Sequence, residues 1–186
     1  ALAKKNLNNN NLIGIGEIGL DYFYEKDKKK EQIELFKKQL SFAQLYDLPV
    51  IIHSREATKD TLDILKQYKL KGIIHCFNGS LEVARQFIKL GFKIGVNGVV
   101  TFKNCKLIEV LKELSIEDFV FETDSPYMTP VPYRGKTNYP NYVESVVDFV
   151  SFKLNIDKNE LIKTSYENYC WKERHRKNKR TASVQL

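Results

Sequence analysis

The sequence predicts an α/β fold in which parallel strands alternate with helices, as in a sheet or barrel built of βα units. Two observations support this prediction. Short apolar runs recur along the chain and end near polar residues, and the segments between them have the period of amphipathic helices. The 186 residues, with 42% hydrophobic content, are enough for a domain with its own core, whereas a complete eight-stranded α/β barrel usually has about 250 residues.

The first predicted strand, within residues 12–22, contains three glycines and the carboxylate of Glu17. A strand buried on both faces is almost continuously apolar, so a charge within it needs a partner, hydrogen bonds or a metal. Three later strands end near residues of similar chemistry, which are His53, His75 and Asp124. Because the carboxyl ends of parallel strands meet at one face, we expect these four side chains to converge. Two imidazoles and two carboxylates suit zinc or manganese, and a bridging carboxylate also tolerates magnesium.

The helices predicted between the strands follow from apolar residues spaced three or four positions apart. In the first helix, within residues 27–48, this apolar face is formed by Ile33, Phe36, Leu40 and Ala43. Further helices are predicted after residues 57, 80, 106, 142 and 157, and a strand without a ligand-type side chain is predicted at residues 92–101.

Two assignments stay open at this level. Alternation along a strand points Glu122 and Asp124 to the same side, so spacing alone does not choose between them as a ligand. Arg55, which follows His53 closely, suits either a substrate phosphate or an ion pair with Asp21 or Glu56.

A long loop at residues 126–140 contains four prolines, and its tyrosines alternate with Arg134 and Lys136. Loops of this length in compact domains are usually functional. Guanidinium groups suit phosphate and aromatic faces suit unstacked bases, so the loop is predicted to contact a phosphate-bearing substrate.

The two ends of the chain are polar. Residues 1–11 are predicted to form a surface segment, and residues 169–186 a basic solvated tail. The formal charge of +7 and the pI of about 9.2 favour polyanionic partners. Three cysteines without a CxxC pair indicate a reducing compartment. No apolar run has the length of a membrane span or the character of a signal peptide, so we expect no membrane association and a location in the cytoplasm, with the nucleus as the alternative.

With these residues in view, the sequence resembles the TatD-type metal-dependent deoxyribonucleases, which have an amidohydrolase-like barrel. The resemblance covers residues 12–168 and rests on five motifs: Gly16-Glu-Ile-Gly-Leu-Asp-Tyr22, His53-Ser-Arg55, His75-Cys-Phe-Asn-Gly79, Glu122-Thr-Asp-Ser-Pro126 and Arg134-Gly-Lys-x-Asn138-x-Pro140. It implies a partial TIM-type (β/α) barrel that matches about the last five of eight strand–helix units. It also implies hydrolysis of DNA phosphodiester bonds by a metal-activated water.

The resemblance assigns roles to residues at matching positions. The implied metal ligands are Glu17, His53, His75 and Asp124, with Glu17 bridging two divalent ions (Mg, Mn or Zn). Glu17 and Asp124 are also the implied catalytic residues, and Asp124 is the expected general base. The implied substrate contacts are Arg55, Asn78, Arg134, Lys136 and Asn138.

Three departures qualify the resemblance. The usual first strand with its His-x-His pair is absent, Tyr139 stands where glutamate is common, and the family pattern stops after Asn168. We therefore expect an N-terminally truncated member with impaired activity, one underligated metal position and open sheet edges that favour self-association. The alternatives are an inactive remnant that binds metal or nucleic acid, and another amidohydrolase-type hydrolase.

Overall fold

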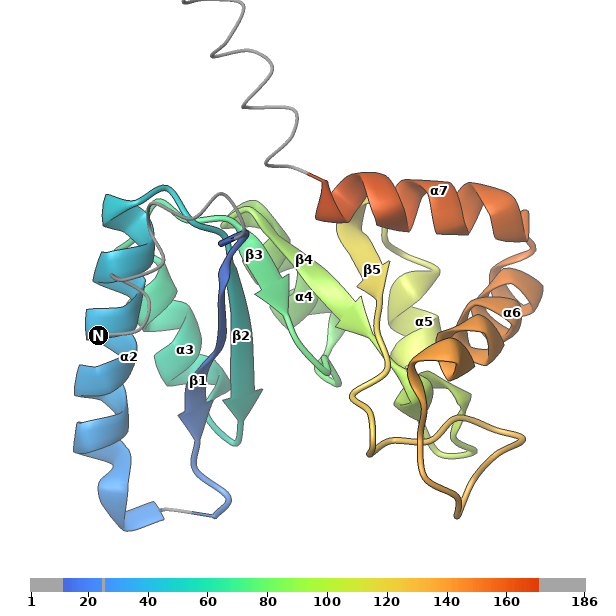
Figure 1. Cartoon of the computed structure of the whole chain (residues 1–186), viewed down its shortest axis with the longest axis horizontal. Coiled ribbons are helices and arrows are strands. Elements are labelled where there is room, and N and C mark those ends of the chain that lie inside the picture. The colour runs from blue at the N-terminus through green and yellow to red at the C-terminus, as the bar shows by residue number, and fades with distance from the viewer. Residues whose placement is uncertain (1–11, 25, 171–186) are drawn as a thin grey trace, which may run out of the picture. The chain divides into compact units, whose positions relative to one another are not determined.

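The computed structural model describes residues 12–24 and 26–170. Its five strands are parallel and lie in the order β1-β2-β3-β4-β5, with helices in the connections (Figure 1). This confirms the predicted α/β class. Packing divides the chain into two compact units: the first runs through His75 and includes Lys89–Phe92, and the second comprises Cys76–Ile88 and the chain from Lys93 onward.

The first unit contains β1 (Ile15–Asp21), η1 (Lys26–Lys28), α2 (Lys29–Leu45), β2 (Val50–Arg55), α3 (Thr58–Leu65) and β3 (Gly72–Ile74). Its strands pair so that Gly19 lies opposite His53. The predicted apolar face of α2 packs against β1, and Phe36 and Leu40 are fully buried there. Burying each of these side chains contributes about 1.5–3 kcal/mol, so this face fixes the orientation of α2 on the sheet.

The outer edge of β1 is hydrogen bonded by a side chain. The Gln32 amide of α2 donates to the Asp21 carbonyl and accepts from the Asp21 backbone N–H, both at 2.8 Å. A neighbouring strand would form the same kind of paired bonds. The helix therefore satisfies this part of the strand edge.

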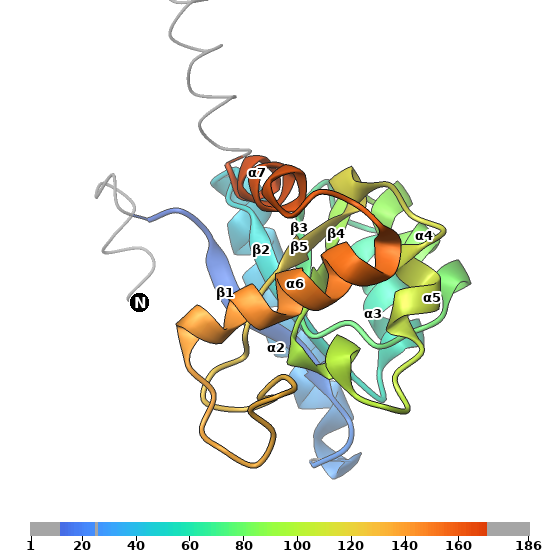
Figure 2. The same ribbon diagram turned by 90° about the vertical axis from the view of Figure 1, so that its right-hand side faces the viewer.

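The second unit contains most of α4 (Leu81–Lys89) and of β4 (Phe92–Val96), followed by η2 (Gly98–Thr101), α5 (Leu107–Leu111), η3 (Ile116–Asp118), β5 (Phe119–Phe121), η4 (Pro140–Tyr142), α6 (Val143–Leu154) and α7 (Lys158–Tyr169). Strands β4 and β5 pair in parallel, and α6 packs against α7 (Figure 2). The predicted cap of α7 is confirmed, because the Asp157 carboxylate accepts from the N–H groups of Asn159 and Glu160.

Helix α7 also hydrogen bonds the edge of β5 that faces away from β4. Ser165 Oγ accepts from the Phe121 N–H at 3.1 Å, and the Tyr169 hydroxyl donates to the Phe121 carbonyl at 2.9 Å. The Asn168 amide donates to the Phe119 carbonyl at 3.0 Å. Three side chains of one helix thus occupy donors and acceptors that would otherwise lie open on the strand.

The strand predicted at residues 92–101 is shorter than expected. Strand β4 ends at Val96, and residues 98–101 form the 3₁₀ turn η2. The Asn97 side chain accepts from the Val99 N–H and so caps the turn. A Cβ on Gly98 would lie 2.0 Å from the carbonyl oxygen of Met128, so the backbone of this turn packs tightly against the long loop.

The predicted polar segment at residues 1–11 lies outside the described residues. So does the predicted basic tail, except for Tyr169, which belongs to α7, and Cys170. Among the described residues, no helix combines the length and the apolar content needed to cross a membrane.

Candidate metal centre

In the first unit, Glu17 and His53 meet on neighbouring strands. Glu17 Oε1 lies 2.7 Å from His53 Nδ1, and the side chains are 46% and 33% exposed. Glu17 is thus more open than a strand buried on both faces would allow. The register of β1 against β2 shifts between Ile15 and Ile18, and β1 is the first strand in the sheet order. The carboxylate is therefore accessible to an ion.

The contact between Glu17 and His53 favours the charged form of each side chain. The hydrogen bond from His53 lowers the pKa of Glu17 against the opposing effect of burial, and the nearby His75 lowers it further. The hydrogen bond to Glu17 raises the pKa of His53, again against burial. Glu17 is consequently ionised at neutral pH and able to bind a cation, although a metal must compete with the proton on His53.

Asp21 holds the opposite side of the His53 ring. Asp21 Oδ2 lies 3.0 Å from His53 Nε2, and Oδ1 accepts from the N–H groups of Phe23 and Tyr24 at 2.9 and 3.3 Å. Burial acts to raise the pKa of Asp21, but the hydrogen bonds from the Phe23 backbone and from His53 outweigh it and leave that pKa lowered. A carboxylate on the remote nitrogen of a histidine orients the ring for metal binding.

From the sequence, Asp21 is predicted only as an alternative ion-pair partner for Arg55. The signal for its role was the spacing: it follows Glu17 by four positions in one strand, and even spacing places side chains on the same face. His75 completes the predicted ligands of this unit. Its N–H donates to the Ile52 carbonyl at 2.9 Å, which fixes the backbone of His75 just beyond the end of β3.

Cys76, Glu122 and Asp124 lie together in the second unit. The Cys76 N–H donates to Glu122 Oε1 at 2.6 Å, and Cys76 Sγ donates to Asp124 Oδ2 at 3.6 Å. The Asn97 amide also contacts the Cys76 sulfur. Cys76 and Asp124 have φ values of +52° and +58°, a left-handed conformation that non-glycine residues adopt uncommonly.

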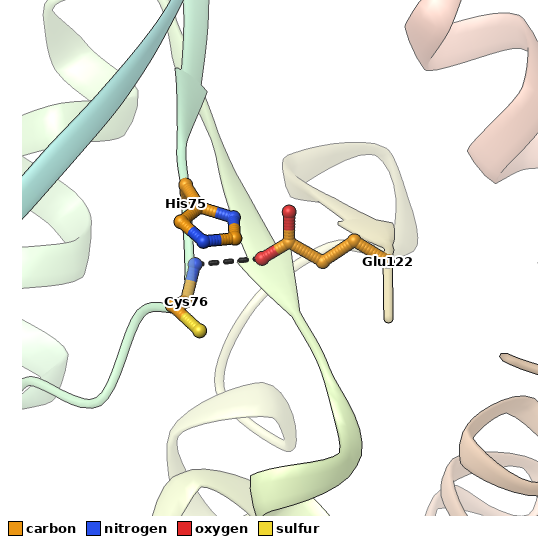
Figure 3. Close-up of side chains that lie close together, drawn as sticks. All are labelled: His75, Cys76 and Glu122. Atoms are coloured by element: carbon orange, nitrogen blue, oxygen red, sulfur yellow. Dashed lines mark hydrogen bonds between the residues drawn. The ribbon is translucent and has the colours of Figure 1, made fainter. Parts of the chain in front are cut away.

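The ligand atoms of His75, Cys76 and Glu122 lie within 4.8 Å of one another (Figure 3). Glu122, which spacing left as an alternative to Asp124, is thus the carboxylate grouped with His75. An imidazole, a carboxylate and a thiol are donors that zinc accepts, and imidazole with carboxylate also suits manganese. The residues therefore fit a divalent ion. The meeting of Glu17 and His53 with Asp124 in one centre remains a prediction.

The predicted substrate contacts have varied surroundings. The Arg55 guanidinium lies over the Phe23 ring at 3.9 Å and the Tyr24 ring at 4.9 Å, an arrangement that neither earlier alternative for Arg55 anticipated. Asn78 is exposed, and its Oδ1 lies 3.8 Å from Cys105 Sγ.

In the long loop, the Arg134 guanidinium lies over the Phe102 ring at 3.9 Å, and Lys136 is exposed. Asn138 is only 2% exposed, and its amide donates to the carbonyls of Thr123 and Tyr127 at 2.8 and 2.6 Å. Asn138 therefore shapes the loop. Its contact with a substrate, like that of Arg55, Asn78, Arg134 and Lys136, stays a prediction.

Comparisons place the chain among known proteins. The family model "TatD related DNase" matches residues 1–171. The uncharacterized metal-dependent hydrolase YabD of Bacillus subtilis is 42% identical over 161 residues, which is 84% of this chain and 63% of YabD. YcfH of Escherichia coli, an uncharacterized metal-dependent hydrolase, is 36% identical over 163 residues, which is 86% of this chain and 62% of YcfH.

Solved structures agree with these sequence matches. The crystal structure of the TatD homologue YjjV of Escherichia coli has a TM-score of 0.80 at 32% identity, covering 85% of this chain and 62% of YjjV. A TatD family hydrolase of Entamoeba histolytica has a TM-score of 0.79 at 27% identity, covering 91% of this chain and 65% of that protein. The chain thus spans between 62% and 65% of the length of each of these four proteins.

Proposed function

Because the chain belongs to the TatD related DNase family, we propose that it is a metal-dependent hydrolase that cleaves phosphodiester bonds in DNA. The observation that carries the proposal is the contact between Glu17 and His53, which join at 2.7 Å on adjacent strands while remaining partly open to solvent. A carboxylate and an imidazole so arranged suit one divalent cation.

Glu17, His53 and His75 would hold one ion, and Glu17 with Asp124 would contribute to a second. Mg, Mn or Zn bound there would stabilise negative charge on the phosphoryl oxygens and lower the pKa of a water molecule. Asp21 has a separate task. When His53 carries its proton on Nε2, toward Asp21, the lone pair on Nδ1 is available beside Glu17.

We assign the general base to Asp124. Its Oδ2 accepts a hydrogen bond from the Cys76 thiol, so this oxygen already lies where it can receive a proton. Glu122, held by the Cys76 N–H, has a backbone donor that limits its movement.

DNA is the proposed substrate because the chain has a formal charge of +7 and exposes Arg134 and Lys136 in one loop. We also propose a cytoplasmic location. In the described part of the chain, Cys76, Cys105 and Cys170 form no disulfide, as expected of thiols in a reducing compartment.

A nuclease assay with a labelled oligonucleotide and Mn or Mg tests the proposal. We expect metal-dependent cleavage that falls by at least about tenfold in Glu17→Gln and in His53→Ala, because each variant removes a proposed ligand. Asp63→Asn is the matched control, since Asp63 is an exposed carboxylate paired only locally with Lys66 at 2.9 Å. Equal cleavage by wild type and Glu17→Gln would refute the assigned site.

Calorimetric titration with Mn separates failure of the metal site from failure of the substrate assignment. If the wild type binds Mn through Glu17 and His53 but cleaves no DNA, the metal site stands and the substrate belongs to another amidohydrolase-type class. If no ion binds, both parts of the proposal fail.

A further inference from the structure

Two exposed aromatic rings and an arginine form a cluster directly after the Glu17 strand. Phe23 and Tyr24 are 45% and 73% exposed, and their ring centroids lie 4.8 Å apart in a T-shaped arrangement. The Arg55 guanidinium lies over both rings, at 3.9 and 4.9 Å. Both rings lie outside the core, in contrast to the preceding Tyr22, which is 4% exposed. We call Phe23, Tyr24 and Arg55 the aromatic platform.

The aromatic platform is joined to the candidate metal centre through one carboxylate. Asp21 Oδ1 accepts from the backbone N–H groups of Phe23 and Tyr24, while Oδ2 contacts His53. Arg55 comes from the same strand as His53, two residues further on. A nucleotide with its phosphate at the proposed metal ligands would consequently have an adjoining base within reach of these rings.

The chain next to the platform carries four lysines, with Asp27 and Glu31 among them. Lys26, Lys28, Lys29 and Lys30 are all exposed and lie in η1 and at the beginning of α2. Positive side chains at the amino end of a helix are opposed by the helix dipole, which Asp27 and Glu31 complement instead. Lys29 packs over the Tyr22 ring at 4.3 Å, which holds its charge near the platform. Positive charge beside exposed aromatic rings is the combination that single-stranded nucleic acids bind.

We propose that the aromatic platform stacks an unpaired nucleobase of a single-stranded DNA substrate while the lysines at residues 26–30 contact its phosphates. This inference rests on the proposed function, and what it adds is the assignment of base stacking to Phe23, Tyr24 and Arg55. Bases in a duplex are stacked on one another, so their faces are closed to Phe23 and Tyr24. The lysines favour a polyanion over an apolar protein segment as the occupant.

The test measures binding separately from cleavage, by fluorescence anisotropy in the presence of a chelator. The probes are a labelled oligothymidylate, a strand of equal length whose bases have been removed, and a duplex. For the double variant Phe23→Ala/Tyr24→Ala we expect about tenfold weaker binding of the oligothymidylate, because one stacked base is lost. Binding of the abasic strand and the salt dependence should match those of the wild type, since phosphate contacts are retained.

Phe152→Ala is the matched control, because Phe152 is an 80% exposed aromatic with Lys153 5.8 Å from its ring, but it lies on α6. It should bind all three probes as the wild type does. Phe23→Leu/Tyr24→Leu keeps apolar volume and removes the rings, so it should reproduce the loss seen with alanine even if the alanine variant folds poorly. Melting temperatures verify folding of each variant.

Two results would overturn the inference: unchanged affinity of the leucine variant for oligothymidylate, or an equal loss for the abasic strand. The cleavage assay on the wild type distinguishes failure of the aromatic platform from failure of the proposed function. Cleavage that persists with unaltered binding in the variants refutes only the aromatic platform. Base-dependent binding without any cleavage supports the aromatic platform and refutes the nuclease assignment.

Discussion

Replacement of Asp21 by asparagine tests whether a carboxylate must face the remote nitrogen of His53. The variant keeps the shape of the side chain and an oxygen that can accept from the Phe23 N–H. The hydrogen bonds to Gln32 involve only the Asp21 backbone, so they are retained. The substitution therefore changes the contact with His53 Nε2, which lies 3.0 Å from Asp21 Oδ2, and little else.

The expected effect is weaker metal binding. An asparagine amide that donates to Nε2 leaves the proton on Nδ1, where the proposed ion would bind. Loss of such an orienting carboxylate costs about 10–100-fold in metal affinity, or roughly 1.4–2.7 kcal/mol. The side chains of His53 and Asp21 are 33% and 28% exposed, so solvent screening favours the lower end, about tenfold.

Calorimetric titration with Mn or Zn at neutral pH measures this change, with Asp63→Asn as the control for loss of an exposed carboxylate. We expect the control to bind as the wild type does. A folded Asp21→Asn protein with the wild-type Kd would show that Asp21 does not prepare His53 for an ion.

Three further predictions concern the metal-free protein. The raised pKa of His53 stabilises the fold fully below the ordinary histidine pKa, and this stabilisation is lost as pH rises through the raised value. The lowered pKa of Glu17 stabilises the fold above the ordinary glutamate pKa, and this stabilisation is lost as pH falls through the lowered value. The free energy of unfolding of the wild type should therefore exceed that of Glu17→Gln by about 1 kcal/mol or less, and only between the lowered pKa of Glu17 and the raised pKa of His53. Thermal melts in chelator measure this difference, and a difference that is as large at alkaline pH as at neutral pH would contradict the prediction. Gly19→Ala should reduce the free energy of urea unfolding by well over about 1 kcal/mol, because φ is +148° and the new Cβ would lie 1.9 Å from the His53 carbonyl oxygen. Gly135→Ala is the control, because Gly135 has φ +83° and nothing lies within 4 Å of the new Cβ, so this variant has only the backbone strain. Equal losses of unfolding free energy in the Gly19→Ala and Gly135→Ala variants would exclude the clash at Gly19. Asn138→Ala should lower the free energy of unfolding by about 1–3 kcal/mol, because the carbonyls of Thr123 and Tyr127 lose a buried donor. Proteolysis of the loop should also be faster, and a loop as resistant as in the wild type would contradict the role of Asn138 in shaping it.

Features set by local periodicity were accessible from the sequence. The apolar positions that predicted the first helix include Phe36 and Leu40, which are fully buried. The placement of Glu17 and His53 near the ends of adjacent parallel strands predicted their meeting, because strand ends share one face.

Features set by distant packing were not accessible. The end of β4 at Val96 depends on Gly98 approaching a carbonyl of the long loop, a contact between segments far apart in the chain. The position of Arg55 over Phe23 depends on the turn after Asp21, and no spacing rule specifies where that turn directs the rings. The burial of Asn138 likewise depends on how its loop folds back on itself.

The side-chain hydrogen bonds on β1 and β5 oppose strand addition at the sheet edges through which self-association is predicted. A foreign strand that adds to β5 must first displace Ser165, Asn168 and Tyr169, and one that adds at the end of β1 must displace Gln32. Each exchanged hydrogen bond gives little net free energy, while removal of α7 also exposes Leu161, which is 1% exposed. Fibril growth through β5 would therefore have to begin with local unfolding of α7, so its rate should depend on the stability of that helix.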